Sequence, residues 1–178
     1  MSHASSLSIH QVATGDLGLE LLATRRVLER VPEEHFAWKP HAKSMSLGAL
    51  AAHLVNLLYW QSTIVGRDEL DLSTLPESTR FIPETREALL EEFDKRATLL
   101  TDALAGISEI DLGRPWKLKF GDRLMLSRTR ADVLRGLGIS HMIHHRGQLT
   151  VYLRMLDIPI PPLYGPTADE RGTWPHDG

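Results

Sequence analysis

The sequence predicts an all-α fold: an antiparallel four-helix bundle with a small β-hairpin inserted between the third and fourth helices. Apolar residues recur at three- and four-residue steps over four long stretches, which is the helical period. One short stretch between the last two helices alternates apolar and polar residues, which is the period of a strand. Because 178 residues is the length of one domain, we expect residues 1–178 to fold as a single unit.

The first two predicted helices are bounded by recognisable end signals. The first covers about residues 8–31 and is closed by Pro32, which cannot continue a helix. The second covers about residues 46–65, where Ser46 is a favourable N-cap and Gly66 follows the end. The second helix contains no acidic residue, so it offers no carboxylate ligand of its own.

The third and fourth predicted helices are equally long. The third covers about residues 84–105, directly after Pro83, and has acidic residues in its first turn, where the helix dipole favours them. The fourth covers about residues 129–156, with Thr129 as its cap, and ends before Pro159. Lengths of about 20–28 residues exceed the globular mean of about 11–12 but are usual in antiparallel bundles.

The segments outside the helices have three different characters. Residues 116–126 show the alternation of a β-hairpin around a turn at Gly121 and Asp122. Residues 66–82 are polar and predict a long connection, a kind of segment that is often functional. The tail, residues 159–178, is too rich in proline and glycine to be helical.

Composition and charge narrow the possible functions. The formal net charge of −3 provides no overall basic field that would attract nucleic acid or anionic lipid. With no cysteine, the chain has neither a disulfide nor a thiolate nucleophile nor a zinc finger. We see no signal-peptide pattern and no apolar run long enough to cross a bilayer. We therefore expect a cytoplasmic protein with no membrane or nucleic-acid partner.

Arginine is concentrated between the hairpin and the end of the fourth helix, where only one acidic residue accompanies it. No aromatic residues interleave with these arginines and no nucleic-acid-binding motif is present. We therefore expect them to form inter-helix ion pairs or a solvated face. The residues concerned are Arg123, Arg128, Arg130, Arg135, Arg146 and Arg154.

Histidines carry the strongest functional signal. His141 and His145 lie four residues apart in the fourth helix, hence about 40° around its axis, so both imidazoles reach one point beside it. His53 points inward among the aliphatic residues of the second helix. Three inward imidazoles from two helices predict a facial site for Zn²⁺, Ni²⁺ or Fe²⁺ with open positions for water or substrate. His144 is marginal for this point because it lies about 60° from His141.

Other interpretations of the histidines stay open or are excluded by single residues. An inward histidine is commonly a hydrogen-bonded core residue, and this holds for His53 taken alone. A zincin needs glutamate directly after its first histidine, where this chain has Met142. A di-iron bundle needs inward glutamates that these helices lack. Solvation explains the remaining histidines, which are in terminal or loop contexts: His3, His10, His35, His41 and His176.

Four further residues are candidates for a pocket around the metal. Trp60 follows His53 by nearly two turns on the same face, and Gln148 and Tyr152 hold the matching position on the fourth helix. Asn56, three residues after His53, is placed to orient a ligand or a substrate. Ordinary packing of the two aromatic residues, and a buried hydrogen bond for Asn56, are equally open. No residue is assigned as a catalytic base, so the expected catalytic group is a metal-bound water or thiolate.

These residues together resemble a known superfamily. The helix with His53 and Trp60, followed by HMIHHRGQLTVYLRMLDIPIPPLYGPTADE, resembles the DinB-like (YfiT-like) metalloenzymes. The resemblance covers most of the chain and is strongest over about the last fifty residues. It implies a DinB/YfiT-like four-helix bundle, frequently a homodimer, with one divalent metal ion on His53, His141 and His145. The position of His144 varies in the superfamily.

The resemblance also implies an activity. Relatives include low-molecular-weight thiol S-transferases and a thiol-dependent isomerase, so we expect metal-dependent activation of a low-molecular-weight thiol toward a small-molecule substrate. A metal-dependent hydrolase uses the same site with water as the nucleophile. A non-catalytic metal-binding, stress-associated protein is a further alternative, as is a bundle whose histidines are structural and whose helices serve dimerisation.

Overall fold

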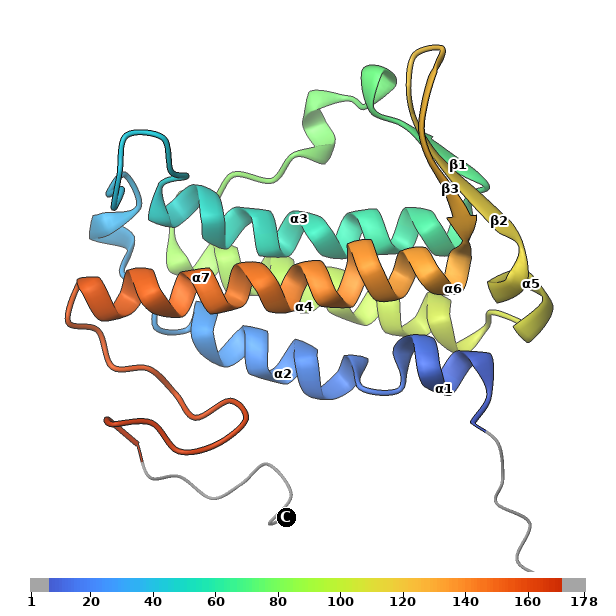
Figure 1. Ribbon diagram of the computed structural model, residues 1–178. Coiled ribbons are helices and arrows are strands. Elements are labelled where there is room, and N and C mark those ends of the chain that lie inside the picture. Colours follow the sequence, from blue (N-terminus) through green and yellow to red (C-terminus); the bar gives the residue numbers. More distant parts are fainter. Residues whose placement is uncertain (1–6, 171–178) are drawn as a thin grey trace, which may run out of the picture.

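The computed structural model describes residues 7–170 of the chain. This part is mostly helical and carries a small three-stranded sheet at one end of the helices (Figure 1). Within it, no helix combines the length and the apolar character needed to span a membrane.

Four helical segments pack side by side and form the body of the molecule (Figure 1). They are α2 (Leu17–Leu28), α3 (Leu47–Gly66), α4 (Arg86–Ala105) and α7 (His141–Met155). Both α2 and α3 pack against α4 and against α7. Each of the four helices therefore has two neighbours among the other three.

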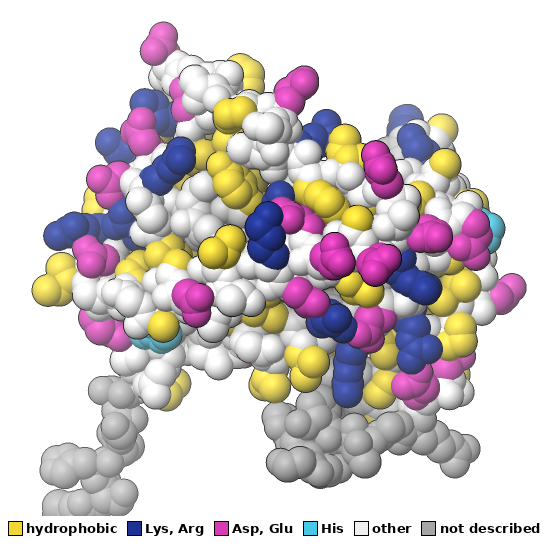
Figure 2. All heavy atoms as spheres, turned by 180° about the vertical axis from the view of Figure 1, so that it is seen from behind, with side chains coloured by type: hydrophobic (Ala, Val, Ile, Leu, Met, Phe, Trp, Pro, Cys, Tyr) yellow, Lys and Arg dark blue, Asp and Glu magenta, His cyan; other side chains and the backbone are white. Residues whose placement is uncertain are grey.

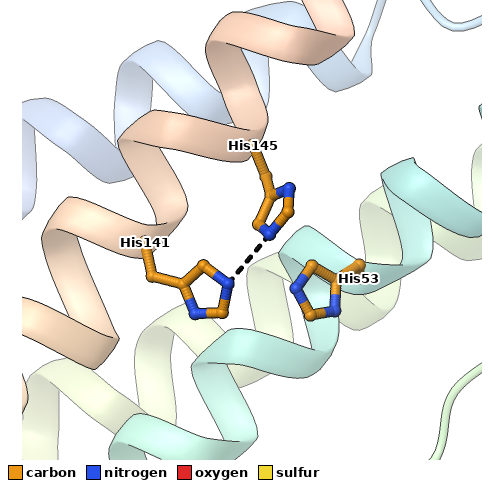
Figure 3. Close-up of side chains that lie close together, drawn as sticks. All are labelled: His53, His141 and His145. Atoms are coloured by element: carbon orange, nitrogen blue, oxygen red, sulfur yellow. Dashed lines mark hydrogen bonds between the residues drawn. The ribbon is translucent and has the colours of Figure 1, made fainter. Parts of the chain in front are cut away.

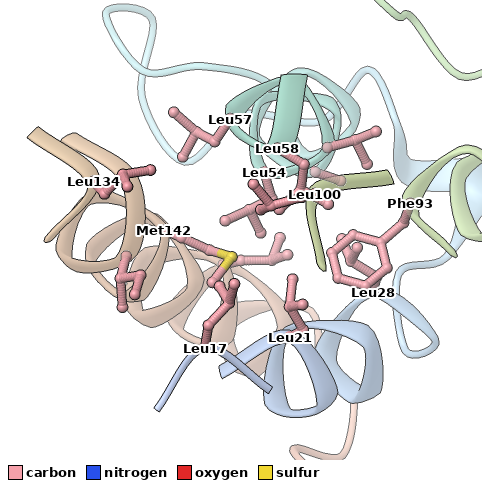
Figure 4. Packing of buried hydrophobic residues seen from close by; sticks show 14 of the residues in the cluster. Leu17, Leu21, Leu28, Leu54, Leu57, Leu58, Phe93, Leu100, Leu134 and Met142 are labelled. Atoms are coloured by element: carbon pink, nitrogen blue, oxygen red, sulfur yellow. The ribbon is translucent and has the colours of Figure 1, made fainter. Parts of the chain in front are cut away.

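One hydrophobic core fills the space between these helices (Figure 4). Each helix contributes side chains that are at most 1% exposed, for example Leu28, Leu54, Phe93 and Met142. Truncating a leucine in such a core to alanine destabilises a protein by about 2–5 kcal/mol. The core therefore holds α3 and α7, the two helices with the predicted metal ligands, at a defined separation.

The first predicted helix, residues 8–31, is divided in the structure. Its two parts are α1 (Ile9–Thr14) and α2, which ends at Leu28. The break lies at Gly15, where a Cβ atom would stand 2.4 Å from the carbonyl oxygen of Gln11. In addition, the carboxylate of Glu109 accepts hydrogen bonds from the backbone N–H groups of Ile9 and His10, at 3.0 and 3.1 Å. This anchor ties α1 to α5 (Glu109–Gly113), a contact far away in the sequence.

The second and third predicted helices agree closely with the structure. Ser46 caps α3 as expected, because its hydroxyl accepts from the N–H of Ala49 at 3.2 Å. Helix α4 begins at Arg86, two residues later than predicted, because Thr85 provides the cap and its hydroxyl accepts from the N–H of Ala88 at 3.1 Å. It ends at Ala105, as predicted.

The fourth predicted helix, residues 129–156, is continuous but irregular. Thr129 caps α6 (Arg130–Val133), a wider π-helical stretch follows over Leu134–Ser140, and α7 begins at His141. Gly138 lies in the π-helical stretch against the buried Gln61 of α3, and a Cβ atom there would stand 2.9 Å from that side chain. The irregular stretch therefore coincides with a tertiary contact, which the apolar periodicity of the sequence could not predict.

The predicted hairpin is confirmed and has a third strand beside it. Strands β2 (Pro115–Phe120) and β3 (Arg123–Thr129) are antiparallel, and Gly121 has the positive φ of 57° that favours glycine in the turn. The sequence interpretation of residues 66–82 as a connection missed β1 (Glu69–Asp71), which pairs in parallel with β2. The Asp71 carboxylate secures this pairing because it accepts from the N–H of Gly121 at 2.9 Å.

The chain after α7 is irregular over its described part, as predicted. It turns at Asp157, whose φ is 58°, and folds back toward α2 (Figure 1). Ion pairs hold it there, between Arg154 and Asp169 and between Arg30 and Glu170. Residues 171–178 of the predicted tail, with His176, lie outside the described residues, as does His3.

The arginine-rich segment forms ion pairs, and its described partners lie outside the acidic helix α4. Arg130 pairs with Asp68, and Arg135 with Asp16 at the start of α2. The α4 acids pair with bases on α4 and α2 instead, for example Asp94 with Arg25. On the face seen in Figure 2, acidic and basic side chains are interspersed.

Candidate metal centre

Three histidines meet between α3 and α7 (Figure 3). His53 comes from α3, and His141 and His145 come from successive turns of α7. One ring nitrogen of each lies within 4.8 Å of the other two. The Nε2 atoms of His141 and His145 are 2.8 Å apart, and the ring centroid of His53 is 4.4 Å from that of His145. The structure thus brings together the three residues that the sequence singles out.

Local helix geometry explains why these rings converge. The π-helical stretch ends at Ser140, so His141 and His145 are separated by one turn of regular α-helix. Helix α3 packs directly against α7, and its His53 is half-buried at that contact. Two rings from one helix and one from its neighbour therefore face the same point.

The surroundings keep all three imidazoles neutral at pH 7. The pKa of His53 is lowered to about 4, mainly by burial and in addition by the neighbouring rings of His145 and His141, because a second positive charge would be repelled. Burial is also the main cause of the lowered pKa of His141 and of His145. A neutral imidazole keeps a free lone pair, which is the form that binds metal ions.

The Nδ1 atoms of His145 and His141, which face away from the centre, have different surroundings. The Nδ1 atom of His145 lies 2.8 Å from Oε1 of Gln148, so it donates there and leaves Nε2 with its lone pair facing the centre. The Nδ1 atom of His141 is buried without a hydrogen-bond partner in the described part of the chain. The backbone carbonyl of Leu137 is close enough to oppose the lowering of the His141 pKa.

The donor set fits a divalent ion. Nitrogen ligands at about 2.0–2.1 Å from an ion lie about 3 Å from one another. The 2.8 Å between the Nε2 atoms of His141 and His145 is close to that value, and a ring nitrogen of His53 lies within 4.8 Å of one ring nitrogen on each of them. A shared ion also accounts for the buried Nδ1 of His141, because Nε2 ligation moves the ring proton to Nδ1, next to the Leu137 carbonyl.

The other described histidines lie outside this group. His144 is exposed and is not among the three, although its ring centroid is 4.8 Å from that of His145. His35 and His41 are exposed, as expected. His10 differs from the expectation of simple solvation: it is half-buried, and its Nε2 lies 3.2 Å from the carbonyl oxygen of Leu104.

Asn56 holds a segment of chain beside His53. Its Nδ2 donates to the carbonyl oxygen of Phe81 at 3.0 Å, and its Oδ1 accepts from the N–H of Phe81 at 2.9 Å. The same oxygen accepts from Arg96 of α4 at 2.9 Å, and the Arg96 guanidinium lies 5.9 Å from the Phe81 ring centroid. The segment between β1 and α4 is thereby fixed where it runs back along α3 (Figure 1).

Two cavities flank this segment, and both reach His53. The first, of about 330 Å³, lies between the start of α3 and residues 80–83. The second, of about 390 Å³, lies between the later part of α3 and residues 75–80, and Trp60 lines it. His53, Asn56 and Arg80 border both cavities.

The two remaining pocket candidates, Gln148 and Tyr152, line neither cavity. Gln148 is exposed and bonded to His145, as described above. Tyr152 packs edge-to-face against Trp38, with ring centroids 5.7 Å apart. Sequence reasoning missed Arg80 and Phe81. The only signal for them was the length of the connection between the second and third predicted helices.

Fold and site together define a class of protein: a mostly helical domain in which two adjacent helices present three neutral imidazoles to one point, beside two cavities. Comparison with known proteins identifies the family of the chain. The chain belongs to the DinB family, whose model matches residues 22–174.

Individual relatives are similar over most of their length. The chain is 23% identical to the uncharacterized protein YrdA of Bacillus subtilis strain 168, over 83% of this chain and 83% of that protein. It is similar in fold to a DinB-like protein from Bacillus cereus ATCC 10987, with a TM-score of 0.67, 22% identity and coverage of 85% of this chain and 95% of the other. The DinB-like protein YjoA of Bacillus subtilis has a TM-score of 0.65 at 23% identity, over 86% and 96% of the two chains.

Proposed function

We propose that this protein is a mononuclear divalent-metal enzyme that activates a low-molecular-weight thiol for transfer to a small-molecule substrate. His53, His141 and His145 are the proposed ligands, for Zn²⁺, Ni²⁺ or Fe²⁺. The observation that carries the proposal is the convergence of three ring nitrogens within 4.8 Å, from two helices. In this proposal α2, α3, α4 and α7 form the antiparallel four-helix bundle, which their mutual packing supports.

The chemistry follows from the neutral donor set. A divalent ion on three uncharged imidazoles keeps its full charge and lowers the pKa of a thiol or water that it binds. The residues of the chain position the reactants. Gln148 orients His145, and Asn56 fixes the segment that separates the two cavities.

Two features favour thiol transfer over the alternative, metal-dependent hydrolysis. A transfer reaction brings two organic molecules together, and two cavities meet at His53. Hydrolysis profits from a general base beside the water. Among the described residues that line the cavities, Glu77 is the one carboxylate, and it borders only the second cavity. A thiol that the ion deprotonates needs no such base.

Metal content tests the site directly. Protein purified without a histidine tag is expected to bind one divalent ion per chain, measured by elemental analysis after dialysis against Zn²⁺ or Ni²⁺. His141→Ala should abolish stoichiometric binding and leave the helical circular-dichroism signal largely intact. The matched control is His144→Ala, a neighbouring exposed histidine, which should keep full metal content. Unchanged metal in His141→Ala would remove that residue from the site.

Activity tests the reaction class. The metal-loaded protein should form a thioether from 1-chloro-2,4-dinitrobenzene with at least one common cellular thiol, releasing chloride, and His141→Ala should lose this activity. Product with water alone would favour the hydrolase. Metal binding with no product from any thiol would favour a non-catalytic metal-binding protein. Absence of metal binding would leave the three histidines a structural role.

A further inference from the structure

We propose that the first cavity is a subsite for a small organic anion with an apolar body, such as an aryl or alkyl carboxylate. The anionic group is bound by Arg80 and the apolar body lies on the wall between α3 and residues 80–83. This proposal rests on the proposed function in one respect: it makes the bound molecule the substrate that meets the ion at His53.

The wall of the first cavity is mainly apolar. Its apolar residues include Phe36, Ala49, Ala52, Phe81, Ile82 and Pro83. Small side chains on the α3 side leave the space open, while aromatic and proline rings close it from the loops. A volume of about 330 Å³ lies at the lower end of the range of about 300–1,000 Å³ that is typical of ligand pockets. The cavity therefore takes one small molecule.

Charge distinguishes the first cavity from the second. Arg80 is the one ionic residue among those described that border the first cavity, whereas Glu77 joins Arg80 at the second. Arg80 is exposed and forms no ion pair within the described part of the chain. A guanidinium presents a planar fork of donors that matches a carboxylate. The polar group of an occupant of the first cavity is therefore expected to be negative.

The position of Arg80 is set before any ligand arrives. The next residue, Phe81, is tied to Asn56 through both of its backbone hydrogen-bonding groups, at 2.9 and 3.0 Å. The N–H of Arg80 itself donates to the carbonyl oxygen of Glu77 at 2.9 Å. A backbone that is already ordered loses little entropy on binding, so the backbone that carries Arg80 is preorganised.

The same cavity opens on the proposed metal ligand. His53 lines it, three residues before Asn56 and one residue after Ala52. A molecule seated with its anionic end on Arg80 and its body on Ala52 and Phe36 therefore lies beside the metal centre. This position suits the electrophilic partner of a thiol and leaves the more polar second cavity to the thiol.

Binding of a simple probe tests the subsite. The probe is 4-phenylbutyrate, and the neutral comparison is 4-phenylbutan-1-ol, both titrated by NMR into the full chain. Arg80→Gln should weaken binding of the carboxylate about five- to tenfold and leave the alcohol unchanged. The charge-matched control, Arg86→Gln, removes an exposed arginine that borders neither cavity and should have no effect. Equal weakening of both probes in Arg80→Gln would contradict the role of the charge.

A second variant tests the cavity itself. Ala49 is exposed and lines the wall, so Ala49→Phe fills the space without disturbing the core and should weaken both probes. Ala105→Phe places the same ring on an exposed position at the end of α4 and should leave binding unchanged. If Ala49→Phe binds both probes like the unaltered protein, the subsite lies elsewhere.

Paramagnetic metal locates the probe relative to the centre. In protein loaded with Co²⁺ the aromatic protons of 4-phenylbutyrate should broaden, while Zn²⁺-loaded protein should show no broadening. Probe binding that is sensitive to Arg80→Gln without any metal binding would uphold the subsite and overturn the proposed function. Metal binding without probe binding would overturn the subsite and leave the proposed function standing. Probe binding without broadening would separate the cavity from the metal centre and overturn its role as a substrate subsite.

Discussion

Arg146 of α7 and Glu20 of α2 form a buried ion pair, and Arg146 is the residue directly after the proposed ligand His145. Their side-chain Nη2 and Oε2 atoms are 2.6 Å apart, and the two residues are only 1% and 5% exposed. Arg146 also donates to the hydroxyl of Thr24 at 3.2 Å, and the Tyr164 hydroxyl donates to Glu20 at 2.7 Å. Because Arg146 follows His145 in the chain, this network fixes α7 against α2 and the C-terminal segment at the level of the ligands.

Breaking that pair on one side should be strongly destabilising. Arg146→Met leaves the Glu20 carboxylate buried without its partner, and we expect a loss of about 3–5 kcal/mol in the free energy of unfolding, measured by urea denaturation. Arg146→Met combined with Glu20→Leu should recover much of this loss. Arg135→Met, which breaks the half-exposed pair with Asp16, is the control and should lose about 0–1 kcal/mol. Equal losses in the Arg146 and Arg135 variants would contradict this interpretation.

The lowered pKa of His53 predicts how the stability of metal-free protein depends on pH. The folded chain resists protonation of His53 until about pH 4, whereas the unfolded chain takes up this proton near pH 6.5. Stability is therefore fully present above pH 6.5 and falls as the pH decreases toward 4. His53→Gln should flatten this part of the profile, while the exposed His35→Gln should leave it unchanged. An NMR titration that puts the His53 pKa at 6.5 would contradict the prediction.

Asn56 is predicted to act through the chain segment that it holds. Asn56→Ala removes two hydrogen bonds to the backbone of Phe81, so we expect a loss of about 1–3 kcal/mol and faster amide hydrogen exchange at Phe81. Metal content should stay at the level of the unaltered protein, because Asn56 does not belong to the histidine group. Ser62→Ala removes a hydroxyl that bonds only within α3 and serves as the control. Unchanged exchange at Phe81 would show that Asn56 does not hold the segment.

The close approach of Gln61 is predicted to require glycine at position 138. A Cβ atom at this position would stand 2.9 Å from the buried Gln61 side chain, so Gly138→Ala overpacks the junction of α3 and the π-helical stretch. The intrinsic helix preference of alanine, about 1 kcal/mol, offsets part of the penalty, and we expect a net loss of about 1 kcal/mol. Gln61→Ala should restore stability when combined with Gly138→Ala. A single variant more stable than the unaltered protein would contradict the prediction.

Much of the local structure could be predicted from short-range signals. The Ser46 cap, the end of α4 at Ala105 and the turn at Gly121 all depend on residues within a few positions of one another. The His141 and His145 pair is of the same kind, because helix geometry alone makes residues four apart share a face. The convergence of His53 on that pair needed one further assumption, that its helix is a neighbour, and the structure places α3 against α7.

The features that sequence reasoning missed depend on contacts between distant residues. The helix that precedes the break at Gly15 is hydrogen-bonded to Glu109. Strand β1 is held to the hairpin by the hydrogen bond between Asp71 and Gly121. Arg80 gave no periodic signal because it lies in an irregular segment, and its place beside His53 follows from the bonds between Asn56 and Phe81. Such interactions span 25 to 100 residues, so no local window contains both partners.

The amino-acid sequence by itself determined the mostly helical character of this DinB-family chain and the identity of the three histidines, because helical periodicity and an i, i+4 spacing are properties of single helices. The tertiary structure alone decided that the segment between β1 and α4 runs along α3 beside His53, that two cavities open there, and that Arg80 borders both. The physical reason is that a cavity consists of space left between elements. Its shape and charge therefore depend on how the packed core sets those elements apart.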